Sequence, residues 1–368
     1  MTHEVATLEV PEWSIAADTT LKPEPGSRQL SASPSSASLL SANTSTCNNK
    51  PKILLMGLSK SGKTSIRNVI FHKMSANETQ FLDPTHKIDK VDISNKSFLD
   101  FQLWDFPGKL DISHLRDKED TSTIEKIFEE ARVLIFVIDP VEEKHSIAID
   151  RLHGTILEAY KINPKIKFEV FIHKSDSINE DQKIDNIREM THRINRKLMS
   201  AGLQDRILIS FRTTSIYDHS IFEAMSIVCQ QLLENILSPF ENILNAFVSS
   251  NKMEKAFIFD LHPKIFIATD SSTFDMPTYE LCCDMLDLIA DMGCIYQEYE
   301  GGEERGVFST CSVIKLNDTL LHLKQINRHL ALVCIQMQQD TACTQGIVDY
   351  NFQQLKHGIQ EVLKVANL

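Results

Sequence analysis

Long apolar runs are missing from this sequence. The longest stretches, such as VLIFVI at 133–138, are far shorter than the roughly 20 residues that a transmembrane helix needs. The first residues, MTHEVATLEV, match neither a signal peptide nor a myristoylation signal, and the last residues, KVANL, carry no cysteine for prenylation. We therefore expect no direct membrane insertion.

Paired cysteines and an excess of basic charge are also missing. The eight cysteines are scattered, and only Cys282 and Cys283 are close neighbours, which fits neither a disulfide framework nor a zinc pattern. We expect a reducing, cytoplasmic compartment in which cysteines are small core residues. The net charge of -12 argues against nucleic acid or an anionic membrane surface as a directly bound partner, so a phosphate ligand needs a local site.

The composition is that of a folded protein with two ordinary domains. Of its 368 residues, 42% are hydrophobic and 24% are charged. Residues 1–50 are rich in Ser, Thr, Ala and Pro and lack periodic apolar positions, so we expect a disordered tail.

Residues 51–238 show apolar strands that alternate with helical stretches. The expected strands are KILLMG, FQLWD, VLIFVID, FEVFIHK and RILISFRTTS, and the expected helices are SIRNVIFHKM, AIDRLHGTILEAYK and KIDNIREMTHRINRKLMSAG. Continuous apolar strands between helices are what a parallel sheet covered on both faces requires. We therefore expect an α/β domain over 51–238.

A break is expected at Ser238-Pro239, because proline ends helices and favours the start of new ones. After it we expect a helix at 240–249, strands KAFIFD and KIFIATD, a helix at 278–292, strands near 294, 308, 320 and 330, and a final helix GIVDYNFQQLKHGIQEVLKV. Strands joined by short loops imply an antiparallel sheet. The second domain, 239–368, is therefore expected to be α+β.

A phosphate-binding loop is the strongest motif. GLSKSGKT at 57–64 matches G-x-x-x-x-G-K-[ST] and stands between an apolar strand and a helix. Its backbone N–H groups and the positive end of the helix favour an anion, Lys63 is expected to neutralise β/γ-phosphate charge, and the Thr64 hydroxyl is expected to bind Mg²⁺. The expected nucleotide contacts here are Ser59, Lys60, Ser61, Gly62, Lys63, Thr64 and Ser65.

A second stretch favours guanine over adenine. His173-Lys174-Ser175-Asp176 follows a strand and is close to N-K-x-D, by which small GTPases recognise guanine. Asp176 can accept hydrogen bonds from the ring N–H and the exocyclic amine, Lys174 can lie along the base, and His173 offers a ring donor or acceptor. Further on, the backbone at Ser215 and Ile216 is compatible with a contact to guanine O6.

Asp105-Phe106-Pro107-Gly108 fits D-x-x-G at the end of another strand. The aspartate is expected to hold Mg²⁺ through water, and the Gly108 N–H to bond the γ-phosphate. A switch threonine is expected before it to reach Mg²⁺, and spacing leaves two candidates, Thr79 and Thr85.

These pieces together resemble the Rag GTPases, specifically the C/D class, called Gtr2-type in fungi. The matching text covers about residues 50–368 and includes GLSKSGKTSI, VIFHKMSANETQFL, WDFPG, FEVFIHKSD, TSIYDHSIFEA, EKAFIFD, KIFIATDSS, YELCCDMLDLI, IKLN, LALVCI and DYNF. The resemblance implies a Ras-like GTPase domain followed by a roadblock-type dimerisation domain, with Thr85 as the switch threonine.

The resemblance also implies partners and a location. These are an A/B-class Rag subunit in an obligate heterodimer, the Ragulator scaffold, the target-of-rapamycin kinase complex and a folliculin-type activating protein. The expected location is the cytoplasm and, through partners, the lysosomal surface, with the nucleus as a second site. In this family the C/D-class subunit promotes signalling when it is GDP-bound.

Lys109 departs from the family, whose members of this class carry glutamine after W-D-F-P-G. An ammonium only donates hydrogen bonds, whereas glutamine can also accept one from an attacking water. With Lys63, Thr85 and Gly108 as the other catalytic candidates, two hypotheses remain: a slow, partner-stimulated GTPase switch, and a scaffold subunit that holds GTP or GDP without turnover. A third, an ATP-using kinase, leaves Asp176 unexplained.

The second domain shows no catalytic constellation. His262, His322 and His329 lie without clustered carboxylates or cysteines at ligand spacing, so surface or satisfied histidines are expected. We expect the protein partner at its exposed strand edge or its first helix, because a sheet edge offers unpaired backbone groups.

Overall fold

The computed structural model describes residues 50–94, 97–110, 121–140, 145–203, 206–296, 311–337 and 345–366. The expected disordered tail, 1–50, lies outside these residues except for Lys50, and so does the strand expected near 308. In the part of the chain that is described, no helix is both long and apolar enough to cross a membrane.

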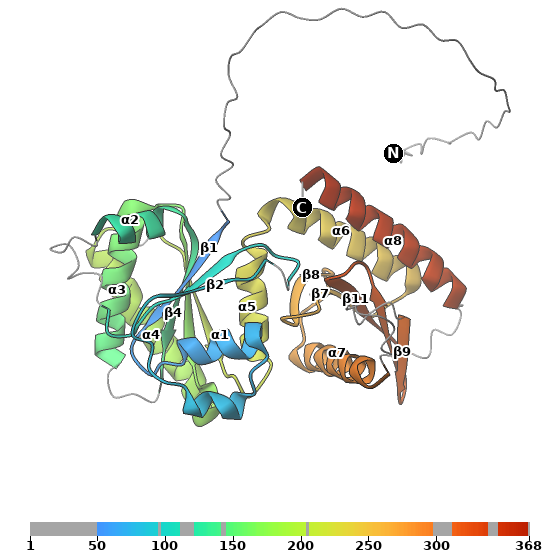
Figure 1. Cartoon of the computed structure of the whole chain (residues 1–368), viewed down its shortest axis with the longest axis horizontal. Helices are drawn as coiled ribbons and strands as arrows, with labels where there is room; N and C mark the ends of the chain where they lie inside the picture. Colours follow the sequence, from blue (N-terminus) through green and yellow to red (C-terminus); the bar gives the residue numbers. More distant parts are fainter. Residues whose placement is uncertain are drawn as a thin grey trace, which may run out of the picture. The chain divides into compact units, whose positions relative to one another are not determined.

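The first sheet has six strands in the order β2-β3-β1-β4-β5-β6 (Figure 1). Five of them are parallel and β2 pairs antiparallel with β3. The strands are β1 (Lys52–Gly57), β2 (Asp89–Asp92), β3 (Gln102–Asp105), β4 (Ala131–Ile138), β5 (Lys167–His173) and β6 (Ile209–Thr214). The expected parallel sheet is confirmed, while β2, with the sequence DKVD, is an edge strand whose charged residues gave no apolar signal.

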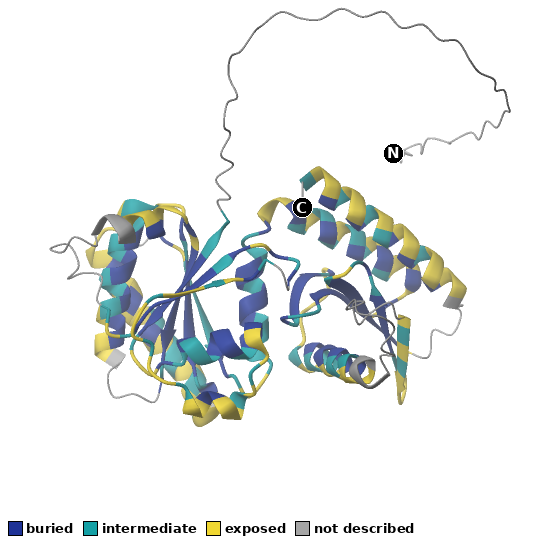
Figure 2. Cartoon of the chain, in the orientation of Figure 1, coloured by how far each residue is buried: buried dark blue, intermediate teal, exposed yellow. Residues whose placement is uncertain are grey.

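Helices cover both faces of this sheet. They are α1 (Lys63–His72), α2 (Thr121–Glu129), α3 (His145–Ile162), α4 (Glu180–Ser200) and α5 (Ser220–Gln230), with 3₁₀ turns η1 (Ala76–Phe81) and η3 (Ser175–Ser177). Alternate residues of β1 enter different cores: Ile53 and Leu55 join the one that contains residues of α1 and α5, whereas Leu54 and Met56 join the one that contains residues of α2, α3 and α4. Burial on both faces explains why the strands are continuous apolar runs (Figure 2).

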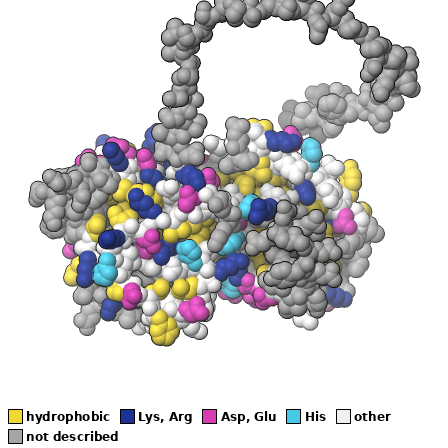
Figure 3. Space-filling view, in the orientation of Figure 1, with side chains coloured by type: hydrophobic (Ala, Val, Ile, Leu, Met, Phe, Trp, Pro, Cys, Tyr) yellow, Lys and Arg dark blue, Asp and Glu magenta, His cyan; other side chains and the backbone are white. Residues whose placement is uncertain are grey.

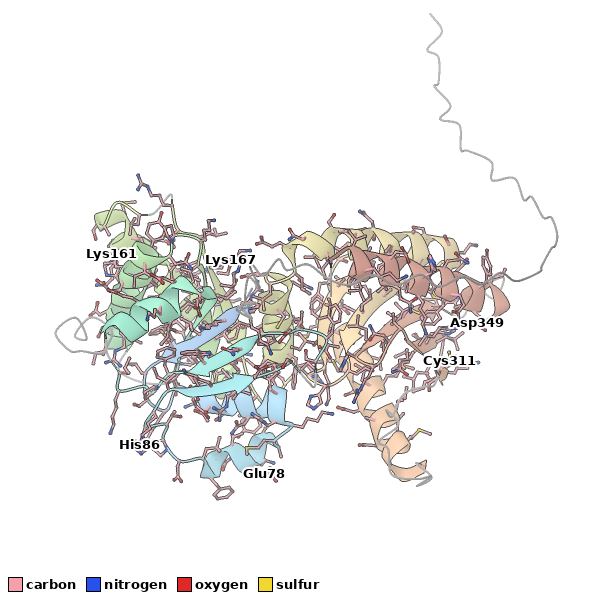
Figure 4. All side chains as sticks on the ribbon, turned by 45° about the horizontal axis from the view of Figure 1, so that its top comes forward. Glu78, His86, Lys161, Lys167, Cys311 and Asp349 are labelled. Carbon is pink, nitrogen blue, oxygen red and sulfur yellow. The ribbon has the colours of Figure 1, made fainter. Side chains whose placement is uncertain are left out.

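The second sheet is antiparallel, with the order β8-β7-β11-β10-β9. Its strands are β7 (Lys255–Asp260), β8 (Ile265–Thr269), β9 (Cys311–Leu316), β10 (Thr319–Gln325) and β11 (Leu330–Met337). The helices are α6 (Glu234–Asn251), α7 (Met276–Tyr296) and α8 (Gln345–Ala366), with α7 on one face and α6 beside α8 on the other (Figure 1). On the α8 side, Asp349 pairs with the buried Lys324 of β10 (Figure 4). The α+β expectation is confirmed.

Two expected elements of this half are wrong. Residue 294 lies in α7, not in a strand, because short apolar runs do not distinguish a strand from a buried helix. The helix expected to begin at 240 begins at Glu234, and Pro239 lies inside it. A proline inside a helix costs about 3 kcal/mol. Four buried side chains, Ile236, Phe240, Leu244 and Phe247, lie on both sides of it, and each stabilises the helix by about 1.5–3 kcal/mol.

Candidate functional site

The phosphate loop connects β1 to α1 at the carboxyl edge of the parallel sheet, where open α/β sheets bind ligands. Gly62 directly precedes α1 with φ of 99°, and a Cβ there would lie 2.9 Å from Nε2 of His173. Glycine is therefore required both by the backbone angle and by the close approach of the imidazole. Helix α1 has no side-chain cap and no acidic residue in its first turn, so its N–H groups face no competing negative charge.

Lys63 is buried at the start of α1. Its Nζ donates to the carbonyls of Gly57 (3.1 Å) and Leu58 (2.6 Å) and to Ser61 Oγ (3.3 Å). Burial lowers the pKa of the Lys63 ammonium to about 8. An anion bound at the loop would favour the charged form of this group.

Three oxygen ligands meet next to the loop. Thr64 Oγ1 lies 2.7 Å from Thr85 Oγ1, and it donates to Asp105 Oδ2 at 2.6 Å. Asp105 is 0% exposed, burial raises the pKa of its carboxyl, and among the described residues its Oδ1 has no hydrogen-bond partner. Hydroxyl and carboxylate oxygens, one of them buried without a partner, fit a hard cation such as Mg²⁺.

The structure distinguishes the two threonine candidates. Thr85 reaches Thr64, whereas Thr79 Oγ1 donates to the carbonyl of Ala76 within η1 at 2.7 Å. Only Thr85 of the two therefore lies with the expected metal ligands.

The D-x-x-G segment lies directly against the phosphate loop. A Cβ on Gly108 would come within 2.6 Å of the carbonyl carbon of Leu58 and would also overlap the backbone of Ser59, so only glycine fits. The Gly108 carbonyl accepts a hydrogen bond from Nη1 of Arg151 in α3 at 2.6 Å. Lys109, which follows, is exposed.

The segment expected to recognise the base is held by hydrogen bonds. Ser215 Oγ donates to Asp176 Oδ1 at 2.6 Å. Lys174 Nζ lies across the phosphate loop, donating to the Lys60 carbonyl at 2.9 Å and to Asp139 Oδ2 at 2.5 Å. These contacts join the loops after β1, β4, β5 and β6 into one site.

His173 is buried against other residues of the protein. Its Nδ1 lies 3.0 Å from Thr214 Oγ1, and its ring lies against Gly62. Burial lowers the pKa of the imidazole to about 4, so it is neutral at pH 7. Ile216, beyond Ser215, packs against the core.

The sequence prediction missed four side chains at this site. Arg67 forms an ion pair with Asp89 and lies 3.9 Å from Asp105. Arg151 donates a hydrogen bond to the Gly108 carbonyl, and Asp139 accepts one from Lys174. The Thr214 hydroxyl contacts the imidazole of His173. Asp139 and Thr214 follow or end apolar strands, which is a usable signal. Arg67 and Arg151 lie inside helices and carry none.

A phosphate loop, an oxygen cluster at its threonine and an aspartate fixed in the turn η3 after β5 define a P-loop G protein. Comparison with known proteins gives the family. The family model described as "Gtr1/RagA G protein conserved region" matches residues 52–286. The chain therefore belongs to the Rag GTPase family, in its C/D class.

Individual relatives agree with this class. The chain is 49% identical to Ras-related GTP-binding protein C of Mus musculus and of Homo sapiens over 319 residues, which cover 86% of this chain and 78% of those proteins. It is 44% identical to GTP-binding protein gtr2 of Schizosaccharomyces pombe over 316 residues, 84% of this chain and 97% of that protein.

Proposed function

We propose that this chain is the guanine-nucleotide-binding switch subunit of a Rag heterodimer, and that it hydrolyses GTP slowly with Mg²⁺. The observation that carries this proposal is the meeting of Thr85 and Asp105 at Thr64, beside the buried Lys63. Such a meeting brings the first switch, the segment that carries Thr85, and the second switch, which begins with Asp105 to Gly108, to the place where the γ-phosphate and its Mg²⁺ would lie. A nucleotide with a γ-phosphate would then hold the switches, and its loss would release them.

Each proposed role follows from an atom that the site offers. The N–H groups of the phosphate loop and Lys63 would hold the phosphates, while Thr64, Thr85 and a water on Asp105 would hold Mg²⁺. The Gly108 N–H would bond the γ-phosphate. Asp176 keeps Oδ2 for guanine, apart from a long 3.4 Å contact with Ser177, while Oδ1 accepts from Ser215.

Equilibrium binding of labelled GTP, GDP and ATP to the full-length chain tests the nucleotide part. We expect tight, Mg²⁺-dependent binding of GTP and GDP and no competition by ATP. Preference for ATP would contradict the role of Asp176 and favour a kinase-like activity instead.

A scaffold subunit without turnover is the second candidate, and Lys109 favours it. This exposed side chain stands where a water-orienting glutamine is expected, and an ammonium has no acceptor for a water proton. Single-turnover hydrolysis of bound GTP separates the two candidates, because the switch gives a slow but measurable rate that the activating protein increases, and the scaffold gives none.

The partner surface is proposed on the second sheet. One edge strand, β8, is covered by α5, whose Ser226 Oγ accepts the Phe266 N–H at 3.0 Å. The opposite edge is β9, where Val313 and Leu316 are 42% and 43% exposed. Among the described residues β9 pairs with β10 alone, and a strand edge of this kind with exposed apolar side chains supports addition of an A/B-class subunit there.

The wider role belongs to the same proposal. Through that heterodimer, the chain would relay amino-acid sufficiency to the target-of-rapamycin kinase complex on the lysosome, held by Ragulator and switched by a folliculin-type activating protein. Cations and carboxylates are interspersed on the face drawn in Figure 3, which suits attachment through proteins better than through anionic lipid. Co-purification with A/B-class subunits and Ragulator tests this part.

A further inference from the structure

Arg151 connects helix α3 to the second switch. Its Nη1 donates to the Gly108 carbonyl at 2.6 Å, across 43 residues of sequence. Its side chain also lines a small cavity together with Phe106, Pro107 and Leu110, so it packs beneath the switch as well as bonding to it. The Arg151 charge is close enough to Lys63 to contribute to the lowered pKa of that ammonium.

Gly108 needs an external restraint. Glycine has the widest backbone freedom of any residue, and its N–H and C=O flank one rotatable Cα. Here the space that a side chain of residue 108 would need is filled by the backbone of Ser59 in the phosphate loop, and proline precedes the glycine. A hydrogen bond from a guanidinium to the carbonyl removes much of the remaining freedom, since charge-assisted hydrogen bonds are the strong ones.

We propose that Arg151 is a positioning residue for γ-phosphate recognition: by holding the Gly108 carbonyl, it keeps the Gly108 N–H facing the γ-phosphate position. This inference rests on the proposed function. The Thr64–Thr85 and Thr64–Asp105 contacts are those that a γ-phosphate and its Mg²⁺ require, and the Arg151 bond occurs together with them. Arg151 thereby favours GTP over GDP without touching either nucleotide.

The same bond also orients the peptide group that links Gly108 to Lys109. The Gly108 carbonyl and the Lys109 nitrogen belong to one planar peptide group. A hydrogen bond that fixes the carbonyl therefore also fixes the direction in which the backbone continues into Lys109. Arg151 therefore also orients the position that distinguishes this chain from its class.

The test compares Arg151→Met, Arg151→Lys and Lys161→Met in the full-length chain. Methionine keeps most of the apolar stem but cannot donate, and lysine can still donate once. Lys161 is an exposed cation on the same helix, labelled in Figure 4, which makes it a matched control. Affinities for GDP and for a non-hydrolysable GTP analogue are measured with Mg²⁺, together with the melting temperature of the GDP-bound protein.

We expect Arg151→Met to weaken the GTP analogue about tenfold while GDP affinity and melting temperature stay unchanged. Arg151→Lys should recover part of the loss, and Lys161→Met should behave like the unsubstituted chain. An unchanged ratio of the two affinities, or equal weakening of both nucleotides, would overturn the proposal for Arg151. Failure of the unsubstituted chain to bind either nucleotide would instead overturn the proposed function.

Discussion

Asp260, the last residue of β7, accepts a hydrogen bond from Ser97 Oγ in the loop between β2 and β3. The same Oδ2 accepts the Phe98 N–H at 2.8 Å. Because β3 ends at Asp105 of the proposed Mg²⁺ site, this buried carboxyl joins the second sheet to the hairpin that leads into the second switch.

The first prediction concerns the pH dependence of stability. Burial raises the pKa of Asp260 to about 7. Between the ordinary value near 4 and this value the folded chain binds a proton that the unfolded chain lacks, so this contribution is complete below pH 4 and is lost as pH rises to 7. We expect the free energy of unfolding to fall by as much as about 4 kcal/mol over that range from this group.

Urea unfolding between pH 4 and 8 measures this fall. Asp260→Asn should flatten the pH slope, whereas Asp185→Asn, at a carboxylate that is 80% exposed on α4, should leave it unchanged. An unaltered slope in the Asp260 variant would show that another group is responsible.

The second prediction concerns Lys109. We expect Lys109→Gln to raise intrinsic GTP hydrolysis about tenfold or more, because glutamine can orient the attacking water and lysine has no acceptor. Single-turnover hydrolysis measures the rate. Lys109→Leu is the control that removes the charge without adding an amide, and a gain in this variant, or none in the glutamine variant, would contradict the explanation.

The third prediction concerns Mg²⁺. Chelation of Mg²⁺ should accelerate release of GTP by at least about tenfold, since two β/γ-phosphate oxygens lose their counter-charge. In Asp105→Asn the same chelation should have a much smaller effect, because the buried carboxylate that holds the ion's water is gone. Release of a fluorescent nucleotide with and without chelator measures both; equal acceleration in the two proteins would exclude Asp105 from the metal site.

The fourth prediction concerns base specificity. Asp176→Asn should weaken GTP at least about tenfold and gain affinity for a xanthine nucleotide, whose carbonyl at C2 accepts from the asparagine amide. Competition binding with the two triphosphates measures the exchange of preference. The neighbouring exposed Asp181, changed to Asn, should keep the guanine preference; a variant at 176 that still prefers guanine would place the base elsewhere.

The fifth prediction concerns the partner surface. Val313 and Leu316 lie exposed on β9, the edge strand at which the partner is proposed to bind. Changing both to Glu should reduce co-purification with an A/B-class subunit by about tenfold or more, since apolar area at an interface core is replaced by charge. Ile184→Glu on α4, at a side chain of similar exposure, is the control. Unimpaired pairing of the β9 variant would exclude the β9 edge from the interface.

Much of the site was predictable because its motifs are local. Gly57–Thr64, Asp105 to Gly108 and His173 to Asp176 each sit at a strand end, and parallel strands bring their carboxyl ends to one edge. The alternation of apolar strands and helices likewise predicted the first sheet. The edge strand β2 and the end of α7 escaped prediction, because charged edges and short apolar runs carry no periodic signal. The start of α6 was misplaced because Pro239 was interpreted as a helix boundary, whereas it lies inside the helix.

The sequence alone determined the nucleotide class, because the strand–loop–helix motifs state their chemistry within a few residues. Spacing left Thr79 and Thr85 open and the family resemblance favoured Thr85, but only the tertiary structure brought Thr85 to Thr64, placed Arg151 on Gly108, and joined Ser97 to Asp260. Those contacts span from 21 to 163 residues of sequence, and such separations are brought together only by packing of the sheets and helices. Packing also carried α6 through Pro239, because its buried side chains stabilise more than the proline costs.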